Sequence, residues 1–231
     1  YFLKKNKKLL VIFRGINTNF YNPQKILPIK LDKFSKQHNI DRNKFIILLP
    51  GRLTSWKGQK IFIEAIKLLY EKTDIPPFES IILGSDQGRN VYKKQLIDLV
   101  QQHRLGKVIK FIDNCEEMPV AYGIANLVCS CSTDPEAFGR VSVEAQSMEI
   151  PIIASDIGGS KETIIKDKTG YLYKNKDPLQ LANTMANVMK KNYNLLKSIG
   201  IEGRKNVLKK FDVDKMCQTT FTEYKKLIEL S

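Results

Sequence analysis

The feature that most limits the fold of this chain is a regular alternation of short apolar runs with longer amphipathic segments. Each run has the length of a buried strand, and each following segment has the apolar spacing of a helix. The runs lie at 44–49, 80–83, 108–112, 126–131, 151–154 and 170–173, and the helical segments between them at 58–72, 89–103, 116–124, 139–148 and 160–166. Continuously apolar strands that alternate with helices are typical of a parallel sheet covered on both faces. We therefore expect an α/β fold with a doubly wound, Rossmann-like sheet of about six strands.

The flanks of this alternating region have a different character. Residues 9–13 form an apolar run that predicts a strand, and residues 28–39 predict a short helix. Residues 178–229 read as helical throughout, in a few segments, with Asp177 and Asp212 as helix starts. We therefore expect C-terminal helices packed after the sheet.

The predicted sheet indicates where a ligand would bind. In the common strand order of a doubly wound sheet, the strand at 44–49 lies beside the strand at 126–131, and the direction of winding reverses between them. Ligands bind in the crevice outside the carboxyl ends of the strands at that point. Two loops, residues 50–58 and 131–140, should meet there.

The first of these loops, residues 50–58, combines two glycines with two cationic side chains. Arg52 offers a planar fork for phosphate oxygens, and Lys57 offers a compact charge. Gly51 and Gly58 allow the backbone to approach a ligand closely. The loop is not a Walker A motif, because the glycine that this motif requires before its lysine is missing. We expect the loop to bind phosphate; a plain solvated loop is the alternative reading.

The second loop leads into a helix and carries the two carboxylates of a Glu-x7-Glu element, Glu136 and Glu144. Pro135 and Gly139 break the chain, so Glu136 lies at the helix entrance, whereas Glu144 lies within the helix. The free backbone N–H groups of a helix N-terminus favour anions, and the two carboxylates flank them. In the alternative reading Glu136 only helps to cap the helix and Glu144 is solvated, and the spacing alone favours neither.

The composition points to anionic partners. The formal net charge of +14 suits a nucleotide, nucleic acid, phosphate or a lipid headgroup, although the lysines are spread over nearly every helix. One dense basic cluster, residues 4–8, is a candidate surface patch. The cysteines at 115, 129, 131 and 217 fit neither a zinc pattern nor a C-x-x-C motif, so we expect reduced, mostly buried thiols and no metal site. The sequence has no apolar run long enough to span a bilayer.

Three short segments, taken in this order, resemble the C-terminal half of glycosyltransferase family 4, also called group 1. They are Gly51-Arg52…Lys57-Gly58, Glu136-Ala-Phe-Gly-Arg-Val-x-x-Glu144, and Gly158-Gly-Ser-Lys-Glu162. The Glu-x7-Glu element is the most specific of the three, and the resemblance covers roughly residues 44–170. Members of this family are retaining enzymes of the GT-B fold. One departure is that Ala137 stands where the family frequently has proline.

The resemblance also implies a division of the chain. Residues 11–20 resemble the family's interdomain connector, so we expect residues 1–27 to hold this connector and a remnant of a missing N-terminal domain. Residues 28–190 would form the nucleotide-sugar-binding, Rossmann-like domain, and residues 191–231 the C-terminal helices that cross back to the first domain. Because the sequence begins with Tyr1 and not methionine, we expect a fragment of a longer protein.

Individual roles follow from the same resemblance. Arg52 and Lys57 would hold the diphosphate and, with Glu136, form the catalytic set. Glu144 would bind the ribose hydroxyls, and Asp113 and Met118 would lie near the base. The remaining residues expected to contact the nucleotide sugar join these in one set: Gly51, Gly58, Gly84, Asp113, Met118, Phe138, Gly139, Arg140, Val141 and Glu144.

The function implied is transfer of a hexose from a UDP- or GDP-sugar to an acceptor, with retention. The acceptor would be a lipid-linked or cell-envelope glycan such as lipopolysaccharide, bound mainly by the missing N-terminal domain. The resemblance implies neither metal nor cofactor, because cationic side chains would stabilise the leaving diphosphate. We expect a cytoplasmic protein with peripheral membrane contact and no nucleic-acid partner, and no turnover by this chain alone.

Two other readings stay open. Another GT-B nucleotide-sugar enzyme, such as an epimerase, would need acids and bases from both domains and does not call for this Glu-x7-Glu spacing. A non-catalytic basic module for nucleic acid or anionic membrane predicts a clustered basic face with exposed aromatic side chains. Retention on DNA against retention on a nucleoside diphosphate would separate these classes.

Overall fold

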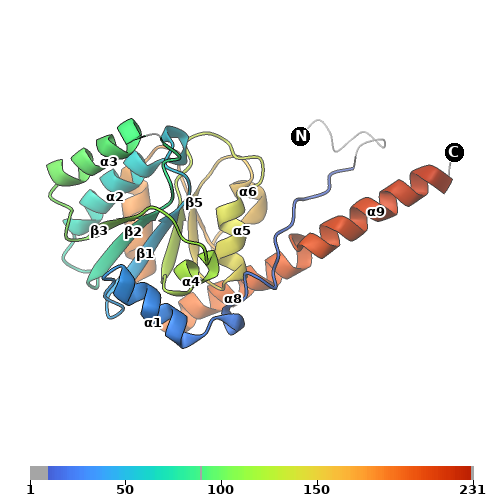
Figure 1. The fold of residues 1–231 in the computed structure, drawn as a ribbon, viewed down its shortest axis with the longest axis horizontal. Coiled ribbons are helices and arrows are strands. Elements are labelled where there is room, and N and C mark those ends of the chain that lie inside the picture. The colour runs from blue at the N-terminus through green and yellow to red at the C-terminus, as the bar shows by residue number, and fades with distance from the viewer. Residues whose placement is uncertain (1–9, 89, 230–231) are drawn as a thin grey trace.

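The computed structural model of the chain, which describes residues 10–88 and 90–229, is built on one parallel sheet of six strands (Figure 1). The strands are β1 Phe45–Pro50, β2 Phe78–Leu83, β3 Ile109–Ile112, β4 Leu127–Ser130, β5 Ile152–Ser155 and β6 Tyr171–Tyr173. Their order is β3-β2-β1-β4-β5-β6, so β1 and β4 pair at the centre of the sheet. The predicted Rossmann-like sheet and its strand order are confirmed.

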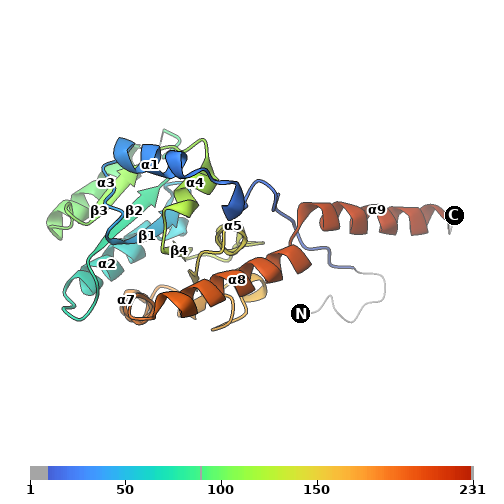
Figure 2. The same ribbon diagram turned by 90° about the horizontal axis from the view of Figure 1, so that it is seen from below.

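Helices cover both faces of the sheet, and each helix expected between two strands is present (Figure 2). They are α1 Pro28–Gln37, α2 Gln59–Tyr70, α3 Asn90–Gln102, α4 Met118–Gly123, α5 Arg140–Ser147, α6 Ser160–Thr163, α7 Pro178–Met189, α8 Tyr193–Lys210 and α9 Val213–Glu229. Short 3-10 turns lie at Pro23–Lys25 and Ser55–Lys57. The C-terminal helices expected after the sheet are therefore α7, α8 and α9.

Alternate residues of the central strand β1 enter two separate apolar cores. Ile47 and Leu49 pack with α2, α3 and α7 on one face. Ile46 and Leu48 pack with α1, α4, α5 and α8 on the other. Successive side chains of a strand point to opposite faces, which is why an apolar strand needs helices on both sides.

The prediction of a strand at residues 9–13 is wrong for residues 10–13, the part of this run that the structure describes. These residues lie outside the sheet, and the side chains of Leu10 and Val11 are 59% and 55% exposed. The chain first pairs at Ile16, whose N–H donates to the carbonyl oxygen of Phe211 at 2.9 Å, after α8. An apolar run forms a strand only where a sheet edge accepts it; here Phe13 instead packs edge-on against Phe211, between α8 and α9, with ring centroids 5.5 Å apart. Leu9 and the basic cluster at 4–8 lie outside the described residues.

The last helix, α9, projects away from the sheet in both views (Figure 1 and Figure 2). No described residue of α9 is buried. Asp212 begins this helix: its Oδ1 accepts a hydrogen bond from the backbone N–H of Asp214 at 2.9 Å. The expected role of Asp212 as a helix start is therefore confirmed.

Candidate functional site

Loops that follow β1, β4 and β5 meet at the carboxyl edge of the sheet. The N–H of Thr133 donates to the carbonyl oxygen of Trp56 at 2.7 Å, which joins the first two loops. The N–H of Gly159 donates to the carbonyl oxygen of Glu136 at 2.7 Å, which joins the second to the third. Gly58, with φ of 72°, lies so close to the β4 loop that any Cβ would overlap its backbone. The structure thus brings together the two loops that the strand order selected.

Lys57 and Glu136, expected as site residues from separate motifs, form an ion pair across these loops. Lys57 Nζ lies 2.8 Å from Glu136 Oε1, and both side chains are 15% exposed. Ser132 Oγ donates a hydrogen bond to the same carboxylate oxygen. The ammonium also lies over the ring of Trp56, 4.5 Å from its centroid, in a cation–π contact. These contacts fix a cation and a carboxylate side by side in the crevice.

Arg52 is exposed, on a loop whose backbone is anchored beneath it. Gln59 Nε2 donates to the carbonyl oxygen of Arg52 at 2.9 Å. Gly51 has φ of 146°, and Gly84 packs so tightly on it that a Cβ on Gly84 would overlap the Gly51 carbonyl oxygen. Because both positions are glycine, the loops after β1 and β2 can touch, and this contact holds the backbone of Arg52 in place. The exposed guanidinium of Arg52 remains accessible to a phosphate.

Glu144 is buried, which corrects the alternative reading of a solvated side chain. It is 6% exposed and lies in α5. Arg140 Nε donates to Glu144 Oε1 at 2.6 Å, and the hydroxyl of Tyr122 donates to Glu144 Oε2 at 2.8 Å. The hydrogen bond and charge of Glu144 raise the pKa of Arg140. Val141, next along α5, is only partly buried and packs against the apolar core on that face.

Phe138 and Gly139 lie where the β4 loop turns into α5. Gly139 precedes the first helical residue with φ of 75°, in the left-handed region that favours glycine. Phe138 packs edge-on against Phe211, with ring centroids 5.8 Å apart. Residues 136–140 line a hollow of about 500 Å³ together with residues 14–17 and Met216 of α9. This hollow gives a ligand room directly beside Glu136.

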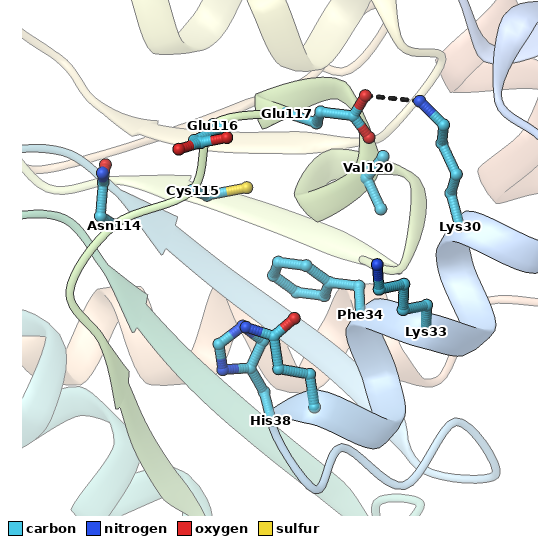
Figure 3. Close-up of a pocket in the computed structure, with 10 residues that line it drawn as sticks. Lys30, Lys33, Phe34, His38, Asn114, Cys115, Glu116, Glu117 and Val120 are labelled. Carbon is cyan, nitrogen blue, oxygen red and sulfur yellow. Dashed lines mark hydrogen bonds and ion pairs between the residues drawn. The ribbon is translucent and has the colours of Figure 1, made fainter.

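Asp113 and Met118, expected near the base, occupy another part of the same edge, because β2 lies between β3 and β1. Asp113 is exposed and pairs with Lys93, and Met118 begins α4. The loop between them faces α1 across a second hollow of about 570 Å³ (Figure 3). In Figure 3 the ion pair of Lys30 with Glu117 spans this hollow and ties the loop to α1.

Two hydroxyl groups at the site were missed by sequence reasoning. Ser132 lies in the loop at 131–140, just after a strand-like run, and Tyr122 lies in a short apolar helix, and neither belongs to a motif. The one available signal for Tyr122 is that a buried tyrosine usually finds a hydrogen-bond partner for its hydroxyl. Its partner lies on a different helix, which local sequence does not reveal.

The structure offers few candidates for other chemistry. Among residues 10–88 and 90–229, no group of His, Cys, Asp and Glu side chains is arranged to hold a metal ion. Over the same residues, every helix is too short or too polar to cross a membrane. Cys129 and Cys131 are buried, and burial raises the pKa of both thiols, so they stay protonated and unreactive at neutral pH.

A parallel sheet of this order, with a crevice at its carboxyl edge and trailing helices, defines one Rossmann-like half of a GT-B fold. The chain belongs to the family described as glycosyl transferases group 1, whose sequence profile matches residues 31–206. It corresponds to the C-terminal half. The crystal structure of the C-terminal domain of a glycosyl transferase group 1 family protein (LpcC) from Francisella tularensis matches 86% of this chain over 100% of its own length, with a TM-score of 0.71 and 25% identity.

Longer relatives match over part of their length. A glycosyltransferase from Rickettsia africae is 29% identical, with a TM-score of 0.92 over 99% of this chain and 61% of its own. Anabaena HepE in complex with UDP-glucose is 27% identical, with a TM-score of 0.83 over 94% of this chain and 57% of its own. The capsular polysaccharide biosynthesis glycosyltransferase CapM of Staphylococcus aureus is 26% identical over 90% of this chain and 52% of its own. The chain thus spans about half of the length of this curated relative.

Proposed function

We propose that this chain is the donor-binding half of a retaining glycosyltransferase and that its carboxyl-edge crevice holds a nucleotide-diphosphate sugar. The observation that carries the proposal is the Lys57–Glu136 ion pair, which joins two motif loops at the switch point of the sheet. Residues 28–190 would form the donor domain, with residues 1–27 as connector and 191–231 as helices that return to the partner domain.

The cations of the first loop would bind the diphosphate. Lys57 has three N–H donors and directs one to Glu136, so the others can meet phosphate oxygens. Arg52, exposed on the same loop, can offer a bidentate fork. Negative charge grows on the diphosphate as its bond to the sugar breaks, and positive groups fixed beside it lower the barrier. These two side chains would therefore do what a metal ion does in other transferases.

The two carboxylates would recognise the two ends of the donor. Ser132 and Lys57 hold Oε1 of Glu136, which fixes the carboxylate so that Oε2 can accept sugar hydroxyls beside the hollow. Glu144 would accept from the ribose, and backbone N–H groups at Phe138 and Gly139 would meet the phosphate. The base would lie toward the loop at residues 113–118.

The substrate class is a proposal that rests on relatives. Solved structures of HepE contain UDP and UDP-glucose, which supports a UDP-hexose donor here. The name of CapM refers to capsular polysaccharide, which supports a cell-envelope or lipid-linked glycan as acceptor. Such an acceptor would place the enzyme in the cytoplasm, with peripheral contact at the inner face of the membrane.

This chain alone would bind donor but transfer no sugar. Transfer needs both reactants held in near-attack geometry, and one half of a cleft fixes only one of them. The test has two arms. Thermal shift with UDP, GDP and their sugars should raise the melting temperature for one base, because a ligand at a hundred times its Kd adds about 2.7 kcal/mol. A radiolabelled-donor assay with saccharide and lipid acceptors should show transfer only after the N-terminal domain is supplied.

The opposite results have separate meanings. If no nucleoside diphosphate or its sugar shifts the melting temperature, the donor-site proposal is wrong. If the chain alone transfers sugar, the acceptor site lies within these 231 residues and the half-enzyme proposal is wrong. Epimerised donor sugar without transfer, once the N-terminal domain is supplied, would favour the other GT-B reading.

A further inference from the structure

The buried carboxylate of Glu144 accepts hydrogen bonds from two unlike side chains, and a third side chain, Tyr21, also interacts with it. On the inner side, the hydroxyl of Tyr122, from α4, donates to Oε2 at 2.8 Å, and Tyr122 is 0% exposed. On the outer side, Arg140 Nε donates to Oε1 at 2.6 Å, and the Arg140 side chain is 70% exposed. One oxygen is thus held from within the core, and the other by a side chain at the surface.

A second buried tyrosine, Tyr21, packs against Tyr122 on the inner side of Glu144. Tyr21, which precedes α1, is 5% exposed, and its ring meets the ring of Tyr122 edge-on at 6.0 Å. Its carbonyl oxygen accepts hydrogen bonds from Ser147 Oγ at 2.7 Å and Arg204 Nη1 at 3.0 Å, which anchors it on α5 and α8. Burial, the charge of Glu144 and hydrogen bonding to Glu144 raise the pKa values of both tyrosines, so the Tyr122 hydroxyl stays protonated as a donor.

We infer that Tyr122 is a positioning residue for nucleotide recognition: its hydroxyl orients the Glu144 carboxylate so that Oε1 can accept a ribose hydroxyl. The inference rests on the proposed donor site. A buried carboxylate needs hydrogen-bond partners, and Tyr122 is the partner that cannot leave without opening the core. Arg140 is exposed, so its guanidinium can shift toward solvent and share Oε1 with a ligand. Nothing in the family motif assigns this task to α4.

The test measures recognition of the ribose alone. Calorimetry compares UDP with 2′-deoxy-UDP, 3′-deoxy-UDP and inorganic pyrophosphate on the wild-type chain and on Tyr122→Phe. The wild type should prefer UDP over at least one deoxy analogue by about tenfold, as for a hydrogen bond to a charged group. Tyr122→Phe should reduce this preference to about twofold and leave pyrophosphate affinity unchanged. A merely structural role would weaken all four ligands together or none.

Two further variants separate the outcomes. Tyr173→Phe removes the hydroxyl of another fully buried tyrosine, in the core on the opposite face of the sheet, and should keep the full preference for UDP. Tyr122→His retains a ring N–H donor and should recover part of the preference. Tyr122→Leu, which has no donor, takes the place of Tyr122→Phe if that variant does not fold. An undiminished preference in Tyr122→Phe, or in Tyr122→Leu if that variant takes its place, would overturn the inference while leaving the donor site intact. A wild-type chain that binds none of the nucleotides would instead overturn the donor site itself.

Discussion

Two glutamates of this chain pair with lysines at opposite edges of the same sheet, and the two sites differ in how fully the carboxylate is occupied. At the amino edge, Glu79 Oε1 lies 2.9 Å from Lys44 Nζ, and Glu79 Oε2 lies 3.0 Å from Lys110 Nζ. At the carboxyl edge, a lysine and a serine both bind Oε1 of Glu136. Within residues 10–88 and 90–229, Glu79 therefore has partners on both carboxylate oxygens, whereas Glu136 has partners on Oε1 alone.

The two carboxylates also differ in exposure, because Glu79 is more deeply buried than Glu136. The side chain of Glu79 is 5% exposed. Burial opposes its charge, but hydrogen bonds from Lys44 and Lys110 outweigh burial and leave the pKa of Glu79 lowered. Glu136 is 15% exposed and lines the hollow of about 500 Å³. A lysine–glutamate pair therefore does not by itself indicate a binding site. What indicates one is the position of the pair at the carboxyl edge and a carboxylate oxygen that can still accept a hydrogen bond from a ligand.

The largest expected effect is at the carboxyl edge. Arg52→Ala should weaken UDP binding by at least tenfold, because a hydrogen bond to a charged group contributes about 1.5–3 kcal/mol. Arg42→Ala is the matched control, since Arg42 is also exposed and pairs with Asp32 near the amino edge. Calorimetry on both variants tests whether only the carboxyl edge contributes to UDP binding. A folded Arg52→Ala chain that binds UDP normally would contradict this.

The second effect is at the amino edge and concerns stability. Glu79→Gln should lower the melting temperature by about 5 °C, because two lysines lose their shared partner and 1 kcal/mol corresponds to about 2–4 °C in a chain of this size. The loss is smaller than for a fully buried pair, since both lysines reach solvent. UDP affinity should not change. Calorimetric melting and titration of the same sample measure both quantities, and weaker UDP binding would contradict a purely structural Glu79.

A third, smaller effect separates the two carboxylates of the donor site. Glu144→Ala should weaken UDP and UDP-glucose alike, by about tenfold, because both carry the ribose. Glu136→Ala should leave UDP affinity unchanged and reduce only the extra affinity of the sugar-bearing nucleotide. Parallel titrations of both ligands decide this, and equal losses in both variants would show that the carboxylates do not divide the ligand.

The smallest effect is the pH dependence of the amino-edge pair. The pKa of Glu79 is lowered on folding from its ordinary 4.5, so its contribution to stability is complete above that value and is lost as the pH falls through the folded pKa. The difference in melting temperature between wild type and Glu79→Gln should therefore be full at pH 7 and shrink only as the pH falls below 4.5, through the lowered pKa of the folded state. A difference that grows on acidification would show that the carboxylate is not held in its charged form.

The sheet and the position of the crevice could be predicted because apolar periodicity reports them directly. The runs at 44–49 and 126–131 are continuous, so both strands had to be buried on two faces, and the loops at 50–58 and 131–140 followed from the strand order. The run at 9–13 has the same appearance, but the sheet has no place for residues 10–13. Local sequence cannot say which runs the sheet accepts.

The inner partners of the site could not be predicted, because they depend on how helices pack. Ser147 and Gln146 look like solvent-facing residues of an amphipathic helix, yet α8 and the segment before α1 cover α5, and both are buried. The same packing buries Glu144 and brings Tyr122 to it from α4. Polar side chains that are satisfied by distant elements leave no periodic trace in the sequence.

A nucleotide-sugar donor should bind at the carboxyl edge of the sheet and not at the amino edge. Amide hydrogen exchange, followed by mass spectrometry on the chain with and without saturating UDP, distinguishes the two edges. Slower exchange is predicted at residues 50–58 and 131–144, with residues 41–46 and 79–80 unchanged. Protection confined to the amino edge, or UDP binding by calorimetry with no protection at residues 50–58 and 131–144, would contradict the claim.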